Sequence, residues 1–176
     1  MKKNRFTTTQ LAIAGLMIAL TVILSYQNIY LFPPRSGRIT LRFIPMIFSG
    51  ILLGPTLGTI IGGASDPLIY FMTLGSPGMY FPGYMLTNMV IGFFPGLIIG
   101  KNIEKESKFS LTLKVALISL LSFAVTIFLD SFWLSITRGK GFWYYVASRT
   151  LPNLIQMGIT FVAILVLTTR IKKTYR

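Results

Sequence analysis

The sequence contains no cysteine and no histidine. The first absence excludes a disulfide framework and a thiolate metal site, and the second removes the commonest general base and metal ligand. Acidic residues are also scarce, with four Asp and Glu among 176 residues. Only Asp66 and Asp130 fall in apolar segments, and nothing in their spacing brings them together as a catalytic pair. We therefore expect no catalytic residues and no metal site.

A nucleotide-binding loop is missing as well. The segment GLIIGKN at 96–102 comes closest to a phosphate-binding loop, but it is one residue short and no Ser or Thr follows the Lys. The chain is therefore expected not to hydrolyse ATP by itself and to carry no cofactor.

Apolar residues, in contrast, are abundant and run in long stretches. Hydrophobic residues make up 53% of the chain and the mean hydropathy is +0.69. This composition is typical of an all-α integral membrane protein in the lipid bilayer of the cell membrane. The runs are continuous and lack the alternation of a membrane barrel, so strands are not expected. We predict one domain over 1–176 with six spans, the second and third short or Gly-rich: Thr8–Tyr26, Thr40–Leu53, Thr56–Leu74, Phe81–Gly100, Leu111–Phe132 and Trp143–Thr169.

The formal charge of +13 would suggest nucleic acid as a partner of a soluble chain, but here the basic residues gather at span ends. We therefore expect no nucleic-acid partner and interpret the charges as topology signals. Eleven of the seventeen basic residues lie in the two termini and the 101–114 segment, which predicts that both termini are cytoplasmic. The basic N-terminus precedes a span without a small-residue cleavage site, so the first helix is expected to be retained. The eleven are Lys2, Lys3, Arg5, Lys101, Lys105, Lys108, Lys114, Arg170, Lys172, Lys173 and Arg176.

The other six basic residues fall on the opposite side and work against that orientation rule. They either attract an anionic solute or are solvated loop charges without a role, and the sequence leaves both interpretations open. These residues are Arg35, Arg38, Arg42, Arg138, Lys140 and Arg149.

The stretch from Gly62 to Gly100 holds the first candidate binding site. An ionisable residue such as Asp66 inside an apolar span is a functional-site candidate. Pro67 directly follows it and is expected to bias Asp66 away from helical geometry, breaking the helix beside a cavity. The alternative is a Pro-kinked helix whose Asp66 caps a helix end. The next span opens on a run of aromatic and amide side chains that completes the candidate site: Tyr80, Phe81, Tyr84 and Asn88.

A second polar group is expected where spans 5 and 6 meet, with Asp130 and Trp133 at the end of span 5. Arg149 and Asn153 are four residues apart and share a helix face, which Gln156 extends inward. A planar guanidinium can bind a carboxylate in a bidentate manner, so this face is a candidate binding site for an acidic ligand. Tyr144 and Tyr145 are explained more simply as part of an interfacial aromatic belt, whereas Trp133 and Trp143 fit either the belt or the site.

Small residues recur at i, i+4 spacing, which lets helix backbones approach closely in lipid. Most such pairs are expected to serve internal packing. Gly15 and Ala19, in LAIAGLMIAL on the first span, are instead candidates for docking a partner helix.

These features together resemble the S components of energy-coupling factor (ECF) transporters, and the resemblance covers 8–171. LRFIPMIFSGILLGPTLGTIIGGASDPLIYF and YFPGYMLTNMVIGFFPGLI resemble the folate-specific subfamily, as does the Arg149 and Asn153 pair on the last span. The family's helix-1 motif is Ala-x-x-x-Ala, where this chain has Gly15 and Ala19. Sister S components for pantothenate or pyridoxine-like compounds share part of the pattern. An autonomous secondary transporter is the other alternative, although no repeat relates 1–88 to 89–176.

The resemblance implies an S-component-like six-helix bundle with a substrate pocket near the extracellular side. Such a subunit binds its vitamin with high affinity and docks on a transmembrane coupling protein that carries two ATPase subunits. For folate, Asp66 would pair with the donor edge of the pterin ring. The ring would stack on an aromatic side chain, and loop arginines would hold the dianionic tail. The residues implied are Phe81, Tyr84 and Trp133 for stacking, and Arg35, Arg38 and Arg42 for the tail.

Overall fold

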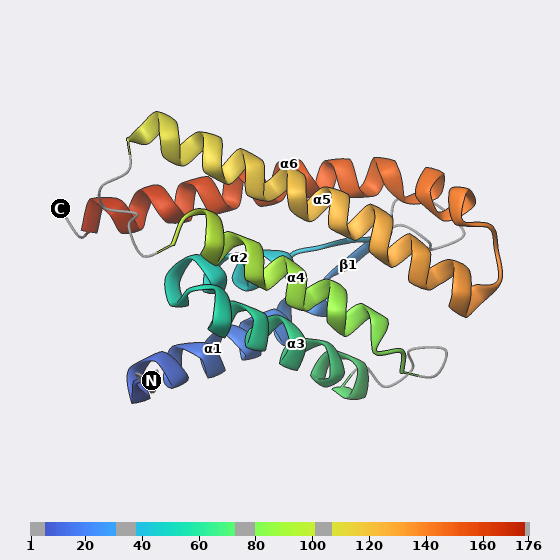
Figure 1. Cartoon of the computed structure of the whole chain (residues 1–176), viewed down its shortest axis with the longest axis horizontal. Helices are drawn as coiled ribbons and strands as arrows, with labels where there is room; N and C mark the ends of the chain where they lie inside the picture. The colour runs from blue at the N-terminus through green and yellow to red at the C-terminus, as the bar shows by residue number, and fades with distance from the viewer. Residues whose placement is uncertain (1–5, 31–37, 73–79, 101–106, 175–176) are drawn as a thin grey trace.

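The computed structural model describes residues 6–30, 38–72, 80–100 and 107–174 (Figure 1). Within them the chain forms six helices and one two-stranded antiparallel sheet. The elements are α1 (Thr8–Ser25), β1 (Asn28–Tyr30), β2 (Arg38–Thr40), α2 (Phe43–Leu53), α3 (Pro55–Met72), α4 (Gly83–Ile98), α5 (Lys108–Arg138) and α6 (Phe142–Thr174).

One helix corresponds to each predicted span, so the predicted six-helix bundle is confirmed. Two details were wrong. A short β-hairpin pairs Asn28 with Thr40, where no strand was expected. The fifth helix continues to Arg138, so Asp130 and Trp133 lie inside it and not at its end. It ends at Gly139, whose φ of 70° is the left-handed geometry that closes a helix.

Length and hydropathy distinguish the helices. Among the described residues, three helices are long and apolar enough to cross a membrane: Thr8–Ser25, Lys108–Arg138 and Phe142–Lys172. The helices Phe43–Leu53 and Gly83–Ile98 are shorter, as the short second span suggested. An 11-residue helix is only about 16 Å long, about half the hydrocarbon thickness.

Glycines join α2, α3 and α4 into one closely packed unit. A Cβ atom at Gly92 would lie 2.1 Å from the carbonyl oxygen of Gly58, and one at Gly50 would lie 2.4 Å from that of Gly92. One at Gly62 would lie 2.2 Å from the carbonyl oxygen of Asn88. These contacts confirm that the recurrent small residues on these helices serve internal packing.

The long helices α5 and α6 lie side by side and form one layer, with α1 to α4 on the other side of the bundle (Figure 1). The start of α1, the start of α5 and the end of α6 lie at one end of the molecule. The turn between α5 and α6 lies at the opposite end. The bundle therefore has a terminal end and a turn end, as the six-span topology requires.

Candidate functional site

Asp66 lies in the interface between α3 and α4, near the turn end of the bundle. Its carboxylate accepts a hydrogen bond of 2.7 Å from the side-chain amide of Asn88, and both residues are buried. The expected helix break at Pro67 is wrong, because α3 continues through the proline to Met72. A proline inside a membrane helix is tolerated where neighbouring helices compensate for its missing N–H. Since Asp66 lies within the helix, the alternative of a helix-end cap is not seen either.

Tyr80 belongs to an aromatic group with Tyr70 and Phe71. Its ring centroid is 5.2 Å from that of Tyr70 and 6.2 Å from that of Phe71. Burial and the nearby Asp66 carboxylate raise the pKa of this phenol. The hydroxyl is therefore protonated at neutral pH.

A second aromatic group joins α4 to α5. The rings of Phe81 and Trp133 are 5.5 Å apart, and those of Phe81 and Tyr84 are 6.1 Å apart. The indole N–H of Trp133 donates a hydrogen bond of 3.2 Å to the hydroxyl of Thr87, which fixes the orientation of the ring. The charges of Asp130 and Arg149 lie close enough to Tyr84 to act on its hydroxyl. Three of the predicted stacking residues thus lie together.

Asp130 and Arg149 form an ion pair between α5 and α6, with 2.9 Å between the guanidinium and the carboxylate. The side chains are 8% and 13% exposed, so this is a largely buried pair. The Nε atom of Arg149 is buried, and no described group accepts a hydrogen bond from it. The side-chain amide of Asn153 donates to the Arg149 carbonyl at 2.9 Å, which confirms that the two residues share a helix face.

The first loop contributes Arg42, at the start of α2. Its side chain is buried, and the guanidinium lies 5.0 Å from the ring centroid of Phe43. Its backbone N–H donates to the hydroxyl of Thr40, whose own N–H donates to Gln156 at 2.7 Å. The hairpin is thereby attached to α6. Arg35, the other predicted loop residue, lies outside the described residues, as does the side chain of Arg38.

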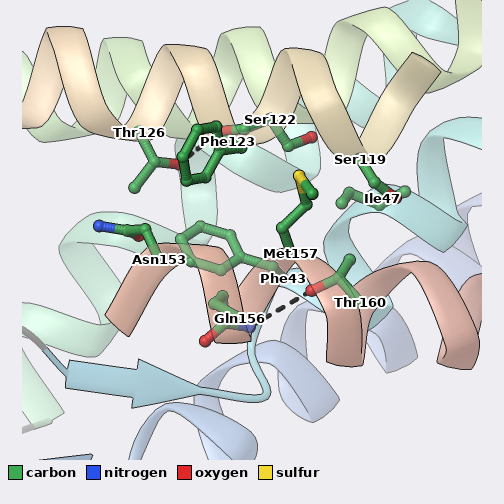
Figure 2. A pocket seen from close by; sticks show the side chains of 10 residues that line it. All are labelled: Phe43, Ile47, Ser119, Ser122, Phe123, Thr126, Asn153, Gln156, Met157 and Thr160. Atoms are coloured by element: carbon green, nitrogen blue, oxygen red, sulfur yellow. Dashed lines mark hydrogen bonds between the residues drawn. The ribbon is translucent and has the colours of Figure 1, made fainter. Parts of the chain in front are cut away.

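A small cavity of about 20 Å³ lies between α2, α5 and α6 (Figure 2). That is enough for about one water molecule and far below the 300–1,000 Å³ of typical ligand sites. Asn153 and Gln156 were among the predicted polar residues, but the hydroxyl side chains of α5 were not, because Ser and Thr are common in apolar spans. The lining consists of Phe43, Ile47, Ser119, Ser122, Phe123, Thr126, Asn153, Gln156, Met157 and Thr160.

The two candidate docking residues lie on the outside of the bundle. Gly15 and Ala19 are both exposed on α1, and a Cβ atom at Gly15 would meet nothing within 4 Å. This distinguishes Gly15 from the glycines buried between α2, α3 and α4. No group of metal-ligating side chains occurs among the residues that the structure describes.

Fold and site together define a multi-pass helical membrane protein with polar and aromatic side chains clustered near one end of the bundle. The profile of the family described as "ECF-type riboflavin transporter, S component" matches residues 5–173. The chain therefore belongs to the S components of ECF transporters, which are substrate-binding membrane subunits and not enzymes.

Individual relatives agree with this family. The chain is 32% identical over 127 residues to the folate transporter FolT of Clostridium novyi (strain NT), which covers 72% of this chain and 70% of the relative. The fold is similar to a crystal structure of FolT bound with folic acid, with a TM-score of 0.78, 24% identity and coverage of 93% and 95% of the two chains. It is also similar to the S component for biotin of an ECF-type ABC transporter, with a TM-score of 0.64, 22% identity and coverage of 97% and 95%.

Proposed function

We propose that this S component binds folate and delivers it to an ECF-type importer. The similarity to FolT supports folate, while the matching family profile carries riboflavin in its description. The observation that carries the proposal is the combination of two buried or largely buried arginines, Arg42 and Arg149, with the aromatic groups around Tyr80 and Trp133. Folate joins a flat pterin ring to a dianionic glutamate tail, so it needs both features. Riboflavin lacks the anionic tail, and biotin lacks the aromatic ring.

The tail is assigned to Arg149 and Arg42. Arg149 keeps a buried Nε–H that donates to no acceptor among the described residues, although another nitrogen of the guanidinium contacts Asp130. A carboxylate bound there would form a charge-assisted hydrogen bond in a largely buried setting, which is stronger than a neutral bond. The role of Asp66 as the partner of the ring stays a prediction.

The transport energy is assigned to partner subunits. Since the sequence has no nucleotide-binding loop, two ATPase subunits and a transmembrane coupling protein would supply ATP hydrolysis, and the chain itself needs no cofactor. The outer face of α1 around Gly15 and Ala19 is the proposed docking surface. Small residues on an exposed helix face allow a partner helix to approach closely.

We place the terminal end of the bundle in the cytoplasm and the turn end outside. Lys108, Lys114, Arg170 and Lys172 lie toward the terminal end, which follows the positive-inside rule. Because the chain has no cysteine, single-cysteine variants report sidedness without background. A membrane-impermeant maleimide should label Lys140→Cys in intact cells and reach Lys108→Cys only after permeabilisation. The reverse pattern would contradict the orientation.

Uptake tests the proposed function. Cells that lack other folate carriers should accumulate labelled folic acid when they express this chain together with an ECF coupling protein and its ATPases. Cells with the chain alone, or with an ATPase made inactive, should not. Accumulation of riboflavin and not of folic acid in the same cells would replace the assigned vitamin and retain the family.

A further inference from the structure

Two exposed cations at the turn end of the bundle have no acidic partner among the described residues. Arg138 is the last residue of α5, and Lys140 lies in the turn that leads to α6 (Figure 1). The described ranges contain two acids, and neither balances these charges. Asp130 is paired with Arg149, and Asp66 lies in the α3 and α4 interface. The surface of this turn therefore presents positive charge that no described acid of the chain neutralises.

The two cations differ in what holds them. Arg138 lies in the last turn of α5, where a positive charge also stabilises the C-terminal end of the helix dipole. Lys140 follows Gly139, which ends the helix, so the dipole does not account for it. The Lys140 ammonium lies 4.6 Å from the ring centroid of Tyr144 and 3.5 Å from the hydroxyl of the same residue. This contact holds Lys140 against the start of α6 and leaves further N–H donors of the ammonium for a ligand.

These exposed cations lie on the outward side of the arginine assigned to the tail. Arg149 follows Tyr144 by five residues on α6, which is about 7.5 Å along the helix axis. The charges of Arg138 and Arg149 both lie close enough to Tyr84 to act on its hydroxyl. Arg149 itself is 13% exposed, whereas Arg138 and Lys140 lie on the surface. Positive charge thus continues from the largely buried tail site to the surface of the turn.

A longer anionic tail can use all of these cations. Folic acid ends in a single glutamate, whose two carboxylates are matched by the arginines already assigned, Arg42 and Arg149. Each further glutamate joined through the γ-carboxyl lengthens the tail and adds one net carboxylate. A tail that continues outward from Arg149 would bring the added carboxylates to Arg138 and Lys140, which offer charged N–H donors.

We propose that Arg138 and Lys140 extend the tail site into a second anion-binding step, and that its ligands are folates with several γ-linked glutamates. The inference rests on the proposed function and deepens it by naming the tail length that the site favours. Because exposed ion pairs contribute little each and are screened by salt, the second step should be weak and salt-sensitive. Affinity should therefore rise with tail length only while these two charges are present.

The test compares folic acid, its triglutamate form and a ring-only pterin on the purified chain by isothermal titration calorimetry at low and high salt. Arg138→Gln/Lys140→Gln removes both charges and keeps polar side chains. Lys108→Gln/Arg170→Gln is the matched control, because it lowers the net charge equally by removing two exposed cations at the terminal end.

The parent chain should bind the triglutamate form about three- to thirtyfold more tightly than folic acid at low salt, as expected for two exposed ion pairs. Arg138→Gln/Lys140→Gln should abolish this difference and leave the affinities for folic acid and the pterin unchanged. High salt should reduce the difference in the parent, and the control variant should keep it. Lys140→Gln alone should lose part of it at an unchanged unfolding temperature, because Lys140 lies beyond the helix end.

Equal affinity of the parent for folic acid and the triglutamate form at low salt would overturn the inference and leave the proposed function intact. A preference for the triglutamate form that persists in Arg138→Gln/Lys140→Gln would overturn it as well, because other groups would then bind the added carboxylates. Binding of neither folate by the parent would overturn the proposed function and the inference together.

Discussion

Replacement of Arg149 tests whether this residue binds the ligand or only neutralises Asp130. The two side chains are 2.9 Å apart and largely buried. Arg149→Gln would therefore leave a buried carboxylate without its counter-charge, which typically costs about 3–5 kcal/mol. A loss of folate binding in that variant alone would be ambiguous, because the bundle itself would be destabilised.

The double variant Asp130→Asn/Arg149→Gln removes the ambiguity. Both charges are gone, the side chains keep their approximate size, and two amides can still form a hydrogen bond across α5 and α6. We expect thermal unfolding of the double variant in detergent to be closer to the parent than that of Arg149→Gln, because replacing both partners is far less costly than removing one.

Folate affinity, unlike stability, should fall strongly in the double variant. Loss of a charge-assisted hydrogen bond costs about 1.5–3 kcal/mol, so the double variant should bind folic acid about 10- to 150-fold more weakly. It should bind a ring-only pterin, which has no glutamate tail, as the parent does. Asp130→Asn alone keeps the arginine and should bind folic acid at least as tightly as the parent. Parent-like folate affinity in the double variant would refute the reasoning and make Arg149 a structural residue.

Two other predictions concern packing and docking. Gly92→Ala should destabilise the bundle by about 1–3 kcal/mol, because the added Cβ would meet the carbonyl of Gly58. Gly158→Ala is the control: a Cβ at Gly158 would meet no atom within 4 Å, so this variant should not lower the unfolding temperature. A similar loss in both variants would show that helix propensity, and not the close contact, sets the cost. Gly15→Leu or Ala19→Leu should abolish uptake and leave folate affinity unchanged, as judged by parallel transport and titration measurements. Equal losses of binding and uptake would place this face inside the bundle.

The helices were predictable from the sequence because each depends on a local property. Continuous apolar runs gave all six, and the spacing of small residues anticipated the close approach of α2, α3 and α4. Two local signals misled the prediction. Pro67 suggested a break that a packed membrane helix does not need, and Asp130 suggested an end to α5 at a position where an ion pair keeps the charge inside the bundle.

The pairing within the site was not predictable, because it depends on how the helices rotate against one another. Asp66 and Asn88 are 22 residues apart, and both stood among the candidates, but nothing local joins them. The hydroxyl groups around the cavity carried even less signal, since Ser and Thr are common in membrane helices and usually bond to their own backbone. Only the packing of α5 against α6 and α2 brings Thr126 and its neighbours to one space.

Titration of the purified, partner-free chain with folic acid, riboflavin and biotin tests the central claim most directly. We expect saturable binding of folic acid in the absence of ATP. It should be tighter than that of the other two vitamins, and weaker in the Asp130→Asn/Arg149→Gln variant. Tighter binding of riboflavin or biotin than of folic acid would contradict it.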